Sequence, residues 1–197
     1  MYVDEEVTLK IQNVVASVDL FFKINLEKAA RVLASQAEIS YIPEQFPGLV
    51  VKIRAPYPKT SALVFSSGKM VITGAKSAQA IDQAVTVLRD LLGKSSEKSP
   101  AITVQNIVAS GNIGYRINLE LAALLLENCM YEPEQFPGLI YRINEPKTVL
   151  LLFQSGNVVC TGAKKEEFAY EAVKKVREDL VNIDAIMSDT EDIGLSF

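Results

Sequence analysis

An internal repeat runs through most of the 197 residues of this chain and limits the folds that it can adopt. Five blocks recur in the same order, which chance does not produce. The matched blocks are residues 11–17 and 104–110 (IQNVVAS, VQNIVAS), 24–27 and 117–120 (INLE), 43–49 and 133–139 (PEQFPGL), 58–60 and 146–148 (PKT), and 73–76 and 161–164 (TGAK). A period of roughly 90 residues is too long for a solenoid unit, so the repeat predicts two pseudo-symmetric half-domains.

The repeat also sets the expected domain boundaries. The first repeat is expected to span residues 1–93 and the second residues 101–187. Residues 94–100 between them are polar and Ser-rich, as is typical of a linker. Residues 188–197 are expected to form an acidic, solvated C-terminal tail.

Each half follows the order strand, helix, several strands, helix. Apolar residues at helical spacing predict helices over residues 26–37, 79–92, 119–127 and 165–187. The short β-rich runs between them are separated by Pro or Ser-Gly, which favours hairpins and a largely antiparallel sheet. Because short hairpins leave no crossover elements, the prediction is an α+β fold whose four helices cover only one face of the sheet.

The composition argues against enzymatic chemistry. The chain has no histidine, which removes the commonest general base and zinc ligand. Cys129 and Cys160 lack metal-ligand spacing, and we interpret both as reduced, packed thiols. We therefore expect no catalytic residue, no metal and no cofactor.

The net charge of −4 does not decide between nucleic-acid binding and its alternatives. Acidic residues gather in the first six positions and in residues 188–192, and the rest of the chain is close to neutral. No apolar run approaches the roughly 20 residues that cross a bilayer, and the acidic N-terminus is unlike a secretory signal. We expect an intracellular protein.

One sheet face is more apolar than an open face should be. Residues 62–65 (ALVF) and 149–153 (VLLLF) are apolar on both sides of the strand. Whichever set faces the helices, Leu63 and Phe65, with Leu151 and Phe153, stay uncovered. A repeated apolar patch of this kind is typical of a binding surface, although a dimer or a second layer could also bury it.

Two further pairs of residues sharpen this hypothesis. Phe46 and Phe136 precede Pro-Gly at loop-to-strand junctions, where a core residue is less expected. Asn13 and Asn106 place an amide in mid-strand, which costs about 1–3 kcal/mol if it is buried without a partner. Each amide could donate to the acceptors of an A·T-rich minor groove, or instead form a bond between strands or mark a β-bulge.

At these residues the chain resembles the TATA-binding protein family, from Val7 to about Leu180. The blocks that carry the resemblance are residues 12–16 (QNVVA), 132–142 (EPEQFPGLIYR) and the two TGAK segments. The resemblance implies a saddle, with one curved ten-stranded antiparallel sheet whose concave face meets DNA and four helices on the convex face. It implies a general transcription factor, and not an enzyme, that binds and bends the TATA box of double-stranded DNA through the minor groove.

The resemblance also assigns residues. Phe46 with Phe65, and Phe136 with Phe153, match two pairs of intercalating wedges, and Asn13 and Asn106 match donors near the pseudo-dyad. The apolar and hydroxyl floor would consist of Val15, Leu63, Val71, Thr73, Val108, Leu151, Val159 and Thr161. The phosphate contacts would be Lys52, Ser67, Lys69, Arg142 and Ser155, while Asn157 stands where the family has a Lys.

Expected partners follow from the same resemblance. Glu132 and Glu134 match the site where the family meets transcription factor B, and RNA polymerase would be reached indirectly through the preinitiation complex. Because the phenylalanines are expected to be exposed, a homodimer of the DNA-free protein is also a possible partner state. The acidic tail, the lack of a long N-terminal extension and a helix at 79–92 poor in Lys and Arg resemble archaeal members. An archaeal member would lie in the cytoplasm or nucleoid, and a eukaryotic one in the nucleus.

Two other interpretations stay open. The chain could be a protein-interaction scaffold or an obligate dimer, in which the apolar face binds protein. Such a protein would not bind DNA. The chain could also be an enzyme domain of similar fold, such as the sheet domain of some DNA glycosylases. Lys76 and Lys164 in the TGAK segments lack the Gly-rich spacing of a phosphate loop, and a strand-to-helix junction explains them better.

Overall fold

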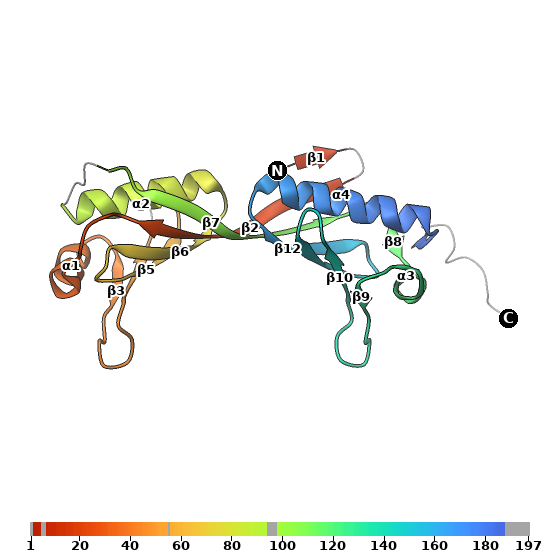
Figure 1. Ribbon diagram of the computed structural model, residues 1–197, viewed down its shortest axis with the longest axis horizontal. Helices are drawn as coiled ribbons and strands as arrows, with labels where there is room; N and C mark the ends of the chain where they lie inside the picture. Colours follow the sequence, from red (N-terminus) through yellow and green to blue (C-terminus); the bar gives the residue numbers. More distant parts are fainter. Residues whose placement is uncertain (1, 5–6, 55, 94–97, 188–197) are drawn as a thin grey trace. The chain divides into compact units, whose positions relative to one another are not determined.

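The computed structural model describes residues 2–4, 7–54, 56–93 and 98–187 (Figure 1). The predicted acidic tail, 188–197, and residues 94–97 of the predicted linker lie outside the described residues. Within the described part of the chain, the structure contains no helix that is both long and apolar enough to cross a membrane.

The chain divides into two compact units. The first unit is Gln12–Asn106, and the second joins the residues up to Ile11 to those from Ile107 onward. The division falls inside two long strands, β2 (Val7–Asp19) and β7 (Ala101–Asn112), so each of these strands contributes to both units. The beginning of the chain therefore packs with the second repeat.

The first unit is a sheet with two helices. Its strands lie in the order β3-β4-β5-β6-β2-β7, with β3 at Glu38–Ser40, β4 at Leu49–Ile53, β5 at Thr60–Val64 and β6 at Lys69–Ala75. The pairs from β3 to β2 are antiparallel. Helices α1 (Leu26–Leu33) and α2 (Ala78–Leu91) complete the unit.

The second unit repeats this plan. Its strands lie in the order β9-β10-β11-β12-β7-β2, with β9 at Cys129–Met130, β10 at Leu139–Ile143, β11 at Thr148–Leu152 and β12 at Asn157–Ala163. Helices α3 (Leu119–Leu125) and α4 (Glu166–Asn182) belong to it. The structure adds β1 (Tyr2–Asp4), antiparallel to β2, and a separate pair of β8 (Arg116–Ile117) with β13 (Ile186–Met187).

The repeated INLE block is a helix start. The Asn25 side chain accepts a hydrogen bond from Lys28 N at 2.9 Å, and Asn118 accepts one from Leu121 N at 3.0 Å. Both Asn residues are thus N-caps, which satisfy backbone donors that have no partner inside the helix. The Leu that follows each cap is buried, so the block fixes both where the helix begins and which side faces the core.

All four predicted helices end earlier than expected, and α2 does so by a single residue, at Leu91. Helix α1 ends at Leu33 instead of 37, and α3 at Leu125 instead of 127. The prediction that the last helix reaches residue 187 is wrong, because α4 ends at Asn182. Asp184 adopts a left-handed φ of 57°, which turns the chain, and Ile186–Met187 then pairs with β8.

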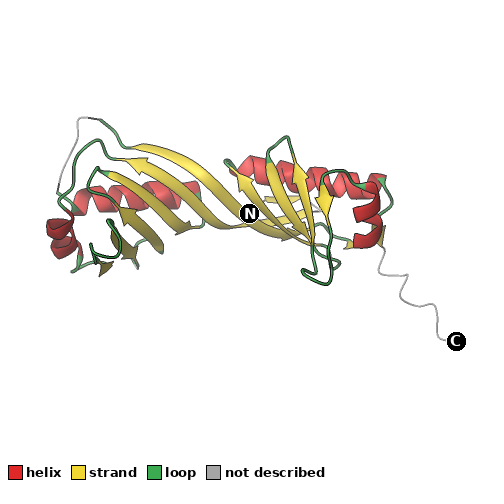
Figure 2. Ribbon diagram, turned by 60° about the horizontal axis from the view of Figure 1, so that its bottom comes forward, coloured by secondary structure: helices red, strands yellow, loops and turns green. Residues whose placement is uncertain are grey.

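The buried core lies between each sheet and its helices. In β5, Thr60, Ala62 and Val64 are buried, while Ser61 and Leu63 are only half-buried. Strand β11 alternates in the same way. The long helix of each unit, α2 or α4, runs along one face of that unit's sheet (Figures 1 and 2). We call the opposite face of each unit its open face.

Glycines close the β5–β6 and β11–β12 turns. Gly68 and Gly156 have φ values of 89° and 83°, which residues with a side chain rarely adopt. A Cβ at Gly156 would also lie 2.1 Å from the carbonyl oxygen of Tyr115. Both the backbone conformation and the lack of space therefore require glycine in this turn.

Replacement of Gly156 by Ala should destabilise the fold. The left-handed φ and the contact with the Tyr115 carbonyl together should lower the free energy of unfolding by about 3 kcal/mol. Gly93→Ala is the matched control, because Gly93 has a φ of 62° but no atom of the described residues within 4 Å of its Cβ position, and it should cost only about 1 kcal/mol. Urea denaturation measures both, and equal losses would show that the close contact carries no energy.

Candidate nucleic-acid interface

The open face of the first unit is built from cross-strand rows. One row, from β4 to β2, consists of Val50, Leu63, Val71 and Ser17. The next row contains Lys52, Ser61 and Thr73. All of these side chains are half-buried except that of Lys52, which is exposed. The residues that alternate with them along the strands are buried against the helices.

The second unit carries the same rows. The equivalent of the first row consists of Ile140, Leu151, Val159 and Ser110. The equivalent of the second contains Arg142, Val149 and Thr161. All the predicted floor residues lie half-buried on the open faces, and these are Val15, Leu63, Val71, Thr73, Val108, Leu151, Val159 and Thr161. Sequence reasoning missed Val50, Ile140 and Val149, although strand alternation from Leu63 and Leu151 could have identified them.

The structure brings the predicted phenylalanines together in two pairs. The ring centroids of Phe46 and Phe65 are 5.9 Å apart with the planes at 64°, and those of Phe136 and Phe153 are 5.9 Å apart at 69°. This edge-to-face arrangement is a favoured geometry for aromatic rings. All four side chains are half-buried, so part of each ring remains accessible.

The loops that carry Phe46 and Phe136 hold these rings in place. Each loop joins an edge strand to its neighbour and projects away from the long helix of its own unit (Figure 1). A Cβ on Gly48 would lie 2.5 Å from the Phe46 ring, and one on Gly138 would lie 2.7 Å from the Phe136 ring. Glycine in the PEQFPGL block therefore lets each ring lie directly over the backbone.

Asn13 is bonded within the first unit. Its Oδ1 accepts a hydrogen bond from Gly74 N at 2.7 Å, and its Nδ2 donates to Thr73 Oγ1 at 3.3 Å. The register of β2 against β6 shifts beside these residues, where Gly74 has a φ of 88°. The strand-to-strand bond considered from the sequence is thus present, and it orients the amide at a β-bulge. Asn106 is half-buried on β7.

The residues predicted to contact phosphate are exposed in both units. They are Lys52, Ser67, Lys69, Arg142 and Ser155. Ser67 and Ser155 occupy equivalent turns, where each hydroxyl accepts a backbone N–H at 3.4 Å, from Lys69 or Asn157. The Asn157 side chain accepts a hydrogen bond from Asn112 Nδ2 at 2.9 Å. Because this side chain is a neutral amide, the position offers no positive charge to a phosphate.

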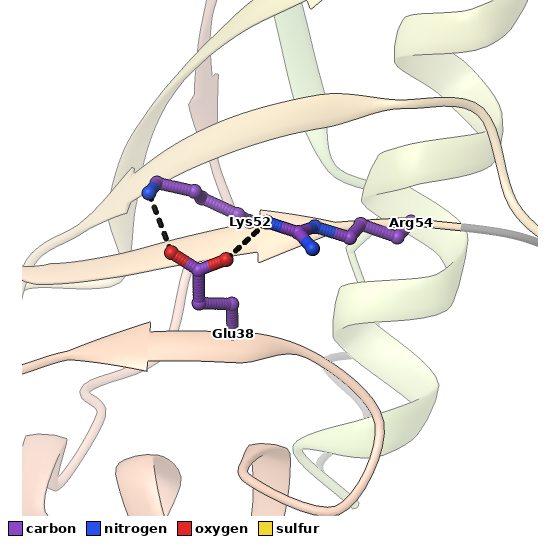
Figure 3. Close-up of polar contacts among 3 residues, drawn as sticks. All are labelled: Glu38, Lys52 and Arg54. Carbon is purple, nitrogen blue, oxygen red and sulfur yellow. Dashed lines mark hydrogen bonds and ion pairs between the residues drawn. The ribbon is translucent and has the colours of Figure 1, made fainter.

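Lys52 is held by an acidic neighbour that sequence reasoning missed. Glu38 on β3 lies opposite Lys52 on β4, and its Oε1 is 2.6 Å from Lys52 Nζ. The other carboxylate oxygen accepts from the guanidinium of Arg54 (Figure 3). The hydrogen bond from Lys52 and the charges of Lys52 and Arg54 hold the pKa of the Glu38 carboxyl below its usual value. Because this triad depends on the pairing of β3 with β4, the sequence alone offered no signal for it.

The other predicted groups have simple surroundings. Glu132 and Glu134 are exposed in the β9–β10 loop, and the Glu132 carbonyl accepts the Phe136 N–H at 2.9 Å. Cys129 and Cys160 are free thiols, and burial raises the pKa of Cys160 to about 12. Among the described residues, no group of three or more His, Cys, Asp or Glu side chains is placed to hold a metal.

Known proteins match this chain along almost all of its length. The family model described as "Transcription factor TFIID (or TATA-binding protein, TBP)" matches residues 8–95 and 101–183. A TATA-box-binding protein of Thermococcus kodakarensis is 50% identical over 188 residues, covering 94% of this chain and 96% of that protein. One from Pyrococcus furiosus is 49% identical over 191 residues, covering 95% and 97%.

A solved structure shows the same fold. The TBP of Methanococcus jannaschii superimposes with a TM-score of 0.79 at 42% identity, covering 88% of this chain and 98% of that one. The predicted fold class, with tandem repeats, an antiparallel sheet and four helices, is confirmed, as is the prediction that the chain is not an enzyme. From its sequence, its fold and these relatives, the chain belongs to the TATA-binding protein family of transcription factors.

Proposed function

We propose that this protein is a general transcription factor that binds the TATA box of promoter DNA in the minor groove. The observation that carries the proposal is the repeated design of the two open faces. Each unit presents an apolar cross-strand row together with an edge-to-face pair of phenylalanines. Membership of the family supports the same conclusion, since relatives from Thermococcus and Pyrococcus are TATA-box-binding proteins.

The chemistry of the open faces suits an A·T-rich minor groove. Such a groove offers the acceptors adenine N3 and thymine O2 and lacks the amino group that guanine adds. Apolar side chains such as Leu63 and Leu151 can approach its sugars and base edges without leaving a donor unpaired. Thr73 and Thr161, from the second row of each unit, add hydroxyls that can donate to the acceptors.

Asn13 and Asn106 are the proposed amide donors to the bases. Because Asn13 Oδ1 already accepts from Gly74 N, the amide group is oriented and its donor end can serve thymine O2 or adenine N3. The bond from Nδ2 to Thr73 is 3.3 Å long, and Nδ2 carries a second hydrogen. Minor-groove acceptors do not distinguish A·T from T·A, so these contacts select A·T content and not direction.

The phenylalanine pairs are the proposed wedges that kink the DNA. Minor-groove proteins of this family insert apolar side chains between base steps, which unstacks the bases and bends the duplex. Pyrimidine–purine steps such as TA unstack most easily, so preference for TATA also arises from deformability. Phe46 with Phe65 would open one step, and Phe136 with Phe153 another. The glycine beneath Phe46 or Phe136 keeps the loop close to the ring.

Backbone and protein contacts complete the proposal. Lys52, Lys69 and Arg142, with Ser67 and Ser155, would hold phosphates beside the apolar rows. The exposed Glu132 and Glu134 would meet transcription factor B, whose binding gives the complex its direction and leads to RNA polymerase and the preinitiation complex. In the absence of DNA, a homodimer would cover the same open faces.

Binding to a TATA duplex should be selective and only modestly dependent on salt. Fluorescence anisotropy compares a labelled TATA duplex with a GC-rich duplex of equal length at several salt concentrations. Since apolar contacts carry much of the affinity, the salt slope should be shallower than that of a protein bound through phosphates alone. Equal binding to both duplexes would contradict the proposal and favour a protein partner for the open faces.

Phe136→Ala combined with Phe153→Ala should abolish bending at one end of the site while leaving the protein folded. Without these two rings, the base step that they would open stays stacked, whereas Phe46 and Phe65 still open the other step. Two-dye FRET across the duplex reports the bend, and thermal unfolding reports the fold.

Phe168→Ala is the matched control for the wedge variant. It removes a half-buried phenylalanine of the same unit from α4, the helix on the covered face. The control should bend DNA like the wild-type protein. An unchanged bend in the double variant would refute the assignment of Phe136 and Phe153 as wedges.

A further inference from the structure

The two units are alike in shape but differ in charge beside their apolar rows. In the first unit Lys52 and Arg54 both contact the Glu38 carboxylate. When the two repeats are aligned at Pro43 and Pro133, the positions of Glu38, Lys52 and Arg54 are occupied by Asn128, Arg142 and Asn144. The second unit thus keeps one cation, Arg142, and has a neutral amide where the first has the carboxylate.

A second cross-strand pair differs in the same sense. Asp19 on β2 lies opposite Lys69 on β6, whereas Asn112 on β7 lies opposite Asn157 on β12. An acid and a base in the first unit are replaced by two amides that hydrogen-bond to each other in the second. The first unit therefore places a carboxylate opposite each of its two predicted phosphate-binding lysines.

We propose that Glu38 is an internal competitor for DNA phosphate, which holds Lys52 and Arg54 in the free protein and releases them only when a phosphate takes its place. The proposal rests on the proposed DNA binding. Lys52 lies in the open-face row with Ser61 and Thr73, so a DNA phosphate would reach its ammonium beside the Glu38 carboxylate. A phosphate that displaces Glu38 exchanges one ionic contact for another, so it adds no net ionic contact at Lys52.

As a consequence, the two units would contribute unequal ionic affinity to the two halves of the binding site. Arg142 faces no carboxylate at the position of Glu38, so each phosphate it binds is a net gain of one ionic contact. The first unit gains less affinity from its cations than their number suggests. Glu38 would act as a residue that tunes the strength and the salt dependence of binding, and not as a contact to DNA.

Glu38→Gln tests this role. The variant keeps the size of the side chain but removes its charge, so Lys52 and Arg54 become available to phosphate. Affinity for a TATA duplex at low salt should rise roughly threefold, the range expected for loss of an exposed ion pair. The slope of log affinity against log salt should become steeper by about one unit, since one more net phosphate contact forms.

Asp82→Asn is the matched control. Asp82 is an exposed acid of the same unit on α2, the helix on the covered face, so its loss gives the same change in net charge. The control should leave both the affinity and the salt slope as in the wild-type protein. A gain equal to that of Glu38→Gln would mean that net charge alone is responsible, and would overturn the proposal.

A second background makes the test specific. In a protein that carries Lys52→Gln and Arg54→Gln, the further change Glu38→Gln should alter neither affinity nor slope, because no cation remains to be released. A persistent gain there, or no gain from Glu38→Gln in the otherwise wild-type protein, would overturn the competitor role while TATA selectivity stands. Loss of TATA selectivity in the wild-type protein itself would instead refute the proposed function, and this inference with it. Thermal unfolding confirms that each variant is folded.

Discussion

In the part of the chain that the structure describes, the helices of each unit cover only one face of that unit's strands (Figure 1), and the rest of the architecture depends on this. Burial of apolar surface stabilises a protein by roughly 25 cal/mol per Å², yet the rows that contain Leu63 and Leu151 remain half-buried in the free chain. An open sheet face usually alternates towards polar residues. The apolar area of these rows is not buried on folding, which leaves the free protein less stable than it could be. The same area can be buried against a ligand with an apolar surface, and this burial would contribute to the affinity.

Duplication explains the shape of the two units, and divergence explains their charge. The apolar rows, the edge-to-face phenylalanines and the glycines at 48 and 138 occur in both units, as the proposed contact of both open faces with the minor groove requires. The charged positions are free of that demand. Because Glu38 with Lys52 stands in one unit and Asn128 with Arg142 in the other, we expect the two surfaces to respond differently to phosphate and to salt.

Much of the fold and site could be predicted because the signals are local or repeated. Residues 62–65 and 149–153 are apolar on both sides of the strand, which predicted an uncovered apolar face in each half, and the repeated PEQFPGL block singled out Phe46 and Phe136 as candidates. The end of α4 was missed because the turn at Asp184 is followed by two residues that pair with β8, far away in the sequence. The partners of Asn13 and Lys52 were missed for the same reason, since Gly74 and Glu38 become neighbours only through strand pairing.

The most direct test of minor-groove recognition is the affinity of the protein for a TATA box in which every A·T pair is replaced by inosine·cytosine. Hypoxanthine lacks the 2-amino group of guanine, so these pairs keep the minor-groove edge of A·T and present the major-groove edge of G·C. Affinity within about threefold of that for the natural TATA box is the result we predict, because the open faces meet only the minor-groove edge. A fall to the affinity of a GC-rich duplex would contradict the account.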